Sequence, residues 1–143
     1  MSATAPSPLR WPLIILLVGL SVPTLPRLLA PLVSHASEAD SFARTFLRDP
    51  GNGLFLLCWT MAPFATLAAF AHVHLRGARL PERVATARRW GVAGALLAIV
   101  ATGWFIHFPG ASHGANLGEA FFVLDAAVLM PIGYGLGRLC ARR

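Results

Sequence analysis

Residues 53–74 read GLFLLCWTMAPFATLAAFAHVH, and residues 91–108 read GVAGALLAIVATGWFIHF. Neither stretch contains an Asp, Glu, Lys or Arg residue. Each is close to the ~20 apolar residues that a helix needs to cross about 30 Å of hydrocarbon. Both stretches therefore predict helices that span a membrane.

The remainder of the chain is also apolar. Of its 143 residues, 56% are hydrophobic and 13% are charged, a balance too apolar for a soluble globular domain. Residues 11–33 and 117–137 also have the length of spanning helices, although they contain prolines and a few charges. We therefore predict an all-α protein: an integral membrane bundle of four antiparallel helices that forms a single transmembrane domain over residues 1–143.

Arginine supplies all of the basic charge, because the chain contains no lysine and has a formal net charge of +6. Most arginines precede the first span, fill the link between the second and third, or follow the fourth. The positive-inside rule then places both termini in the cytoplasm (N-in, C-in), and we infer a multi-pass protein of the cell membrane, in a bacterium the inner membrane. Because the arginines do not line one face, we expect the lipid bilayer and no nucleic acid as a partner.

Two segments outside the firmest spans have more than one interpretation. Residues 37–49 begin with Ser37 as a cap and carry Phe42 and Phe46 one turn apart, which predicts a short amphipathic outer helix between the first two spans. A docking surface for an outer partner is the alternative. Residues 13–20 and 34–36 can also be interpreted as the apolar core and cleavage site of a signal peptide, which would leave three spans.

Charged residues inside the predicted spans are the most informative functional signal, because an unpaired charge in hydrocarbon is costly. Arg27 lies about 9 Å below the outer end of the first span, and Asp125 lies about 12 Å below the outer end of the fourth. Because their depths match, we predict a buried ion pair between them. The pair either fixes how the helices pack, or Arg27, Asp125 and Glu119 line a pathway for protons or cations.

Three histidines, His35, His107 and His113, fall near the outer ends of spans or in the outer links. Imidazole titrates near neutral pH and binds metals, so these side chains are candidates for a proton or metal relay. Their spacing matches no known ligand motif, and solvated histidines at the membrane interface are the plainer interpretation. We expect no cofactor, and the identity of any metal stays open.

Small residues mark the third and fourth spans. Gly133 and Gly137 are four residues apart in the fourth span, and the small residues Gly91, Gly94, Ala95 and Ala98 lie along the third. Small residues at this spacing let membrane helices approach closely. We predict that they serve packing within the chain, with dimerisation as the alternative.

The functional prediction follows from these features. No nucleophile stands with a plausible base, and no phosphate-binding loop or paired-histidine metalloprotease motif is present, so enzyme activity is the minor interpretation. We predict a small polytopic membrane protein that is a non-enzymatic component of a membrane assembly, with another membrane protein or with copies of itself. The alternative is a small proton- or cation-coupled transporter or channel that acts as a homo-oligomer.

Overall fold

The computed structural model describes residues 9–33, 49–76, 81–107 and 117–141, with side chains described except at 26–33, 107 and 117–120. In these ranges the secondary structure is four helices and no strand: α1 (Arg10–Val33), α3 (Pro50–Leu75), α4 (Glu82–His107) and α5 (Leu117–Cys140). The prediction of an all-α protein is confirmed. The predicted outer helix at 37–49 and the cleavage site at 34–36 fall, apart from residue 49, outside the described residues.

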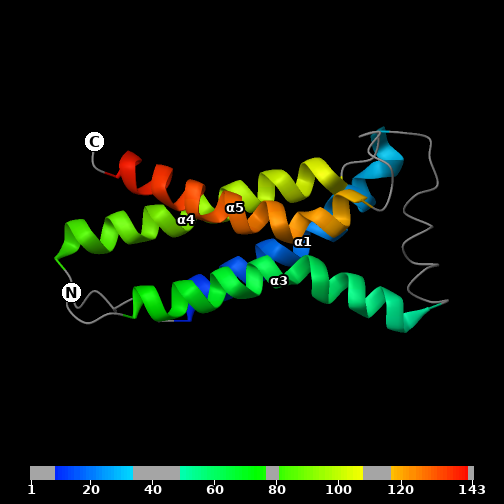
Figure 1. Ribbon diagram of the computed structural model, residues 1–143, viewed down its shortest axis with the longest axis horizontal. Coiled ribbons are helices and arrows are strands. Elements are labelled where there is room, and N and C mark those ends of the chain that lie inside the picture. Colours follow the sequence, from blue (N-terminus) through cyan, green and yellow to red (C-terminus); the bar gives the residue numbers. More distant parts are fainter. Residues whose placement is uncertain (1–8, 34–48, 77–80, 108–116, 142–143) are drawn as a thin grey trace.

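Three helical stretches are long and apolar enough to cross a membrane: Pro50–Leu75, Glu82–Ile106 and Phe121–Cys140. The described apolar stretch of α1, Arg10–Leu25, is shorter. Helices α3, α4 and α5 lie roughly along the long axis of the molecule and α1 runs obliquely to it, and the chain reverses direction from each helix to the next (Figure 1). The chain is therefore compatible with a multi-pass membrane protein.

Helix α3 begins before the apolar stretch that predicted it, and its N-terminus explains the difference. Oδ1 of Asp49 accepts a hydrogen bond from the backbone N–H of Asn52 at 3.1 Å. Pro50 occupies the first turn, where a residue without an N–H leaves no helical hydrogen bond unmade. Asp49, the last residue of the predicted outer helix, is therefore the N-cap of α3.

Helix α4 also begins before its apolar stretch. The carbonyl of Pro81 accepts hydrogen bonds from the N–H groups of Val84 at 2.8 Å and Ala85 at 3.1 Å, which closes the first turn. Glu82 in that turn places a negative charge where the helix dipole favours one. Arginines 83, 88 and 89 therefore lie on a helix rather than in a loop.

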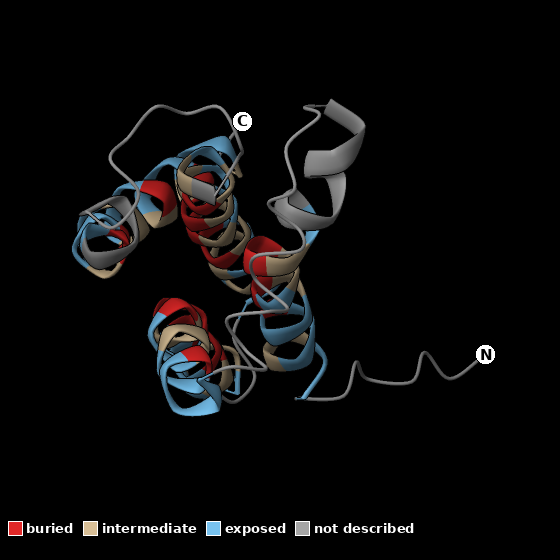
Figure 2. Cartoon of the chain, turned by 90° about the vertical axis from the view of Figure 1, so that its right-hand side faces the viewer, coloured by how far each residue is buried: buried red, intermediate tan, exposed pale blue. Residues whose placement is uncertain are grey.

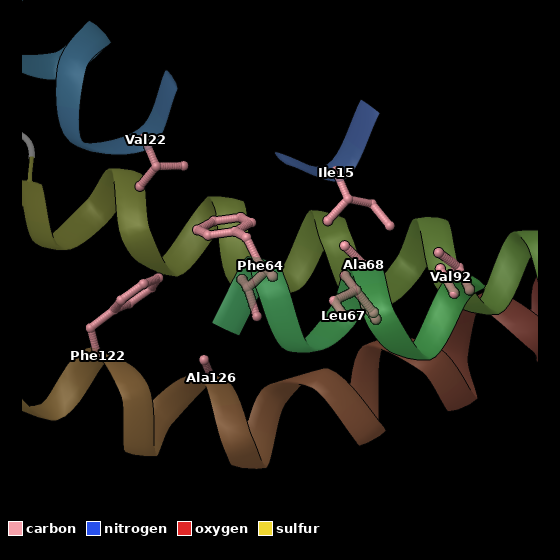
Figure 3. Packing of buried hydrophobic residues seen from close by; sticks show 11 residues of the cluster. Ile15, Val22, Phe64, Leu67, Ala68, Val92, Phe122 and Ala126 are labelled. Atoms are coloured by element: carbon pink, nitrogen blue, oxygen red, sulfur yellow. The ribbon is translucent and has the colours of Figure 1, made fainter. Parts of the chain in front are cut away.

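The core lies between the helices, on the sides that face one another, whereas exposed residues point outward (Figure 2). At its centre, Phe64 of α3 packs against Phe122 of α5, with ring centroids 6.3 Å apart (Figure 3). Gly19 of α1 makes room for Phe64, because a Cβ there would lie 2.5 Å from the ring. Gly103 of α4 makes the same room for Val22 and Phe122. The buried hydrophobic residues are Ile15, Val22, Phe64, Leu67, Ala68, Ala71, Val92, Ala95, Ile99, Phe122 and Ala126.

Five serine and threonine hydroxyl groups within the helices bond to their own backbone. Each donates to a carbonyl oxygen three or four residues earlier, as Thr60 does to Leu56 at 2.9 Å and Thr102 does to Ala98 at 3.0 Å. A hydroxyl satisfied in this way can lie in hydrocarbon without a partner on another helix. The residues that form such bonds are Ser21, Thr24, Thr60, Thr66 and Thr102.

Candidate functional site

Of the two residues of the predicted ion pair, Asp125 alone has a side chain that the structure describes. Asp125 is exposed on α5. Arg27 lies on α1 and Glu119 on α5, and both of these side chains are outside the described residues. Among the described residues, Cα atoms of α1 come within 8 Å of those of α3 and α4 but not of α5, whereas the side chains of Val22 in α1 and Phe122 in α5 both border Gly103 of α4. The Arg27–Asp125 pair and the ion pathway therefore stay predictions.

The predicted histidine relay also lies beyond the described side chains. His35 and His113 are outside the described residues, and His107 is the last residue of α4, with its side chain not described. In the part of the chain that the structure describes, no group of three or more His, Cys, Asp or Glu residues is arranged to hold a metal ion. The relay stays a prediction.

Gly133 and Gly137 lie where α5 meets α4, the most extensive contact between helices in the described part of the chain. A Cβ at Gly133 would lie 2.5 Å from the carbonyl oxygen of Gly94 and 2.9 Å from the Cβ of Ala98. A Cβ at Gly137 would overlap the carbonyl oxygen of Trp90. These glycines let the two backbones touch, as small residues do between membrane helices.

Asp125 lies on an apolar, exposed face of α5. We call this surface the Asp125 face: residues Phe121, Leu124, Asp125, Val128 and Ile132, which share one side of the helix by their spacing. Leu124 and Val128 are 60% and 62% exposed, so large apolar side chains point away from the bundle around the carboxylate. The carboxylate lies within the stretch Phe121–Cys140 that is apolar enough to span a membrane.

A polar cluster joins α3, α4 and α5 at the end of the bundle where α3 ends and α4 begins. We call it the Tyr134 cluster: Phe70 and His74 of α3, Arg88 of α4, and Tyr134 and Arg138 of α5. Nε2 of His74 and the Tyr134 hydroxyl are hydrogen bonded at 2.7 Å. The Phe70 ring stacks on His74 at 4.8 Å and meets Tyr134 edge-on at 5.7 Å. The cluster therefore links the ends of three helices through satisfied polar groups.

Two arginines complete the Tyr134 cluster. Nη1 of Arg88 donates a hydrogen bond to the backbone carbonyl of His74 at 2.9 Å. The guanidinium carbon of Arg138 lies 5.8 Å from the centroid of the Tyr134 ring, within the range of a cation–π interaction. The ring itself lies over Gly91, where a Cβ would be 2.5 Å from the Tyr134 ring. Arg88 is thus held by the end of α3, and Arg138 lies beside the Tyr134 ring.

A groove runs along α3, α4 and α5 next to the Tyr134 cluster. We call it the α3–α4–α5 groove; its volume is about 480 Å³ and its lining is almost entirely apolar. Its polar side chains are already satisfied, because the Thr66 hydroxyl donates to the carbonyl of Ala62 at 2.9 Å and the Tyr134 hydroxyl is bonded to His74. The lining residues are Thr66, Leu67, Phe70, Ala95, Ala127, Met130, Pro131 and Tyr134.

Sequence reasoning did not identify the Tyr134 cluster. Neither His74 nor Tyr134 was among the candidate residues predicted from the sequence. The two are sixty positions apart in sequence, but both lie near the inner ends of their predicted spans. Comparing the depths of residues in the membrane, which led us to pair Arg27 with Asp125, could have paired His74 with Tyr134 too.

Comparison with protein-family models, with curated proteins and with solved structures gives no match for this chain. The functional conclusion therefore rests on the residues and their geometry.

Proposed function

We propose that this chain is a four-span protein of the cell membrane, in a bacterium the inner membrane, and a non-enzymatic component of a membrane assembly. In this proposal the helices form an antiparallel bundle with both termini in the cytoplasm. The arginines at the start of α1 and α4 and at the ends of α3 and α5 support this orientation, because basic residues are retained on the cytoplasmic side.

The exposed position of Asp125 is the observation that carries the proposal of an assembly. An ionised aspartate inside a membrane helix costs about 3 kcal/mol or more when it faces lipid without a partner. Asp125 points away from the bundle among large exposed apolar side chains. A second protein that covers the Asp125 face, with a donor or a cation opposite the carboxylate, removes that cost and buries the apolar residues around it.

The described interior supports an assembly component over a transporter formed by a single chain. Among the described residues, Thr60 is the one polar residue that is buried as a whole, at 7% exposure, and its hydroxyl is bonded within its own helix. Two further polar atoms in this part of the chain, Nδ1 of His72 and Nε1 of Trp104, are buried without a hydrogen-bond partner, and they lie on different helices. A pathway for protons or ions requires a series of polar or ionisable groups that line a cavity. The α3–α4–α5 groove is apolar, and Asp125 does not line it.

The native mass tests this proposal most simply. The wild-type chain, the Asp125→Leu variant and the control Leu97→Ala, which alters a 70% exposed residue of α4, are extracted gently from their own membrane at native expression level. We expect the wild type and Leu97→Ala to carry a stoichiometric partner that Asp125→Leu loses, while the thermal stability of the chain itself is unchanged. A wild-type chain of 15.3 kDa without a protein partner contradicts the proposal.

An intrachain pair with Arg27 is the competing explanation of how Asp125 is satisfied. It predicts that Arg27→Leu and Asp125→Leu each lower accumulation of the protein and that the double variant restores it. An interchain partner predicts that the double variant still lacks the partner. If the partner is a second copy of this chain, vesicle flux assays with Asp125→Asn then test the transporter alternative.

The orientation has its own test, because Cys140 is exposed near the end of α5 and Cys58 is the other cysteine. In a Cys58→Ser background, we expect a membrane-impermeant maleimide to label Cys140 only after the inner membrane is opened. Labelling in intact spheroplasts would place the C-terminus outside and overturn the N-in, C-in orientation.

A further inference from the structure

We propose that the α3–α4–α5 groove binds an acyl chain of an anionic phospholipid, whose phosphate is held by Arg88 and Arg138 at the end of the groove. This is a site within the protein's own surface, separate from the Asp125 face. The two surfaces lie on different sides of α5, because Ala127 and Tyr134 line the groove whereas Asp125 and Val128 lie on the Asp125 face.

The chemistry of the lining points to an acyl chain rather than a polar solute. The side chains that surround the groove are aliphatic, aromatic or proline apart from Thr66 and Tyr134. Both of those hydroxyls are hydrogen bonded within the protein, at 2.9 Å and 2.7 Å. An occupant therefore meets a surface that is almost entirely apolar, and both of its hydroxyls already have a partner within the protein.

The groove extends along the helices. Its lining on α5 runs from Ala127 to Tyr134, about 10 Å along the helix axis, and its volume is about 480 Å³.

The charge at the end of the groove selects an anion. Tyr134 lines the groove, and Arg138 lies over the ring of that tyrosine at 5.8 Å. Arg88 uses one of its guanidinium N–H groups on the His74 carbonyl, and a guanidinium has further donors for phosphate oxygens. Basic pockets between membrane helices on the cytoplasmic side bind anionic head groups in this way. The apolar groove and the paired arginines thus match the two parts of one phospholipid.

Lipid titrations by native mass spectrometry on the purified full-length chain test the site. The probes are phosphatidylglycerol and phosphatidylcholine with the same acyl chains, and inorganic phosphate as a competitor. We expect phosphatidylglycerol to bind about tenfold more tightly than phosphatidylcholine, with no displacement by phosphate. Arg138→Gln should weaken phosphatidylglycerol about fivefold, because one arginine at the membrane surface contributes about that factor, and Arg138→Lys should retain most of it.

Matched variants separate this site from a general attraction to anionic membranes. Arg89→Gln removes an exposed arginine of α4 next to Arg88 and should leave the affinity unchanged. Ala127→Phe fills the groove and should abolish the preference, whereas Ala101→Phe, at an exposed position of α4 outside the groove, should not. Equal binding of the two lipids, equal losses for Arg89→Gln and Arg138→Gln, or no effect of Ala127→Phe would each overturn the proposal.

Discussion

On one side of α5, the Tyr134 hydroxyl is bonded to His74 and its ring contacts Phe70 and Arg138. On another side of the same helix, about 14 Å away along the axis, Asp125 is exposed among apolar side chains. The first polar group finds its partners inside the chain, and the second finds none among the described residues. In a membrane helix, a polar group satisfied internally stabilises the fold, whereas one that faces outward indicates a partner.

The largest effect on folding should come from a substitution on the side of α5 that packs against α4. We expect Gly133→Leu to abolish the folded protein, because its side chain would occupy the space of the Gly94 backbone and of Ala98. Gly135→Leu is the matched control, since no heavy atom lies within 4 Å of a Cβ at that position. Membrane accumulation and monodispersity after extraction measure both; similar losses in the two variants would show that helix contact is not the cause.

A smaller effect on stability is expected when either of two neighbouring phenylalanines, which lie on different sides of α5, is replaced by alanine. Phe122 is 1% exposed and packs against Phe64, whereas Phe121 is 51% exposed on the Asp125 face. Phe122→Ala should lower the free energy of unfolding by about 3 kcal/mol through the cavity it leaves. Phe121→Ala should change it by less than about 0.5 kcal/mol. Unfolding in mixed micelles measures both, and a larger loss for Phe121→Ala would reverse the assignment of the two sides.

The smallest effect should come from the hydrogen bond of the Tyr134 cluster. Tyr134→Phe keeps the ring between Phe70 and Arg138 but removes the hydroxyl bonded to His74, so it should cost about 1 kcal/mol of unfolding free energy. His74→Leu combined with Tyr134→Phe should cost less than the sum of the two single variants, because both remove the same bond. Strict additivity in this double-mutant cycle would show that the bond contributes nothing.

The sequence predicted the helices well because uninterrupted apolar runs of membrane length have few other structures available. The sequence located the starts of α3 and α4 less well. The apolar stretch stops at the membrane interface, whereas each helix extends beyond it, to the residues that follow Asp49 and Pro81. The sequence contains signals for these helix starts, because Asp-Pro and Pro-Glu precede the apolar stretches.

The rotation of each helix about its axis could not be predicted. Helix α5 is apolar on nearly every side, so hydrophobic periodicity does not reveal which residues face α4 and which face outward. The position of Asp125 in the sequence gives its depth in the membrane. It does not give the direction in which the side chain points. The contact between His74 and Tyr134 depends on that same rotation, which is fixed by the packing of glycines such as Gly91 and Gly137.

The most direct test of whether another protein covers the Asp125 face is site-specific photo-crosslinking in intact cells at native expression level. A photoreactive amino acid replaces Val128, one turn from Asp125, or Leu97, which is 70% exposed on α4. We predict a discrete protein adduct from position 128 that Asp125→Leu abolishes, and no such adduct from position 97. The absence of a protein adduct at position 128, or an adduct that persists in Asp125→Leu, would contradict the proposed assembly.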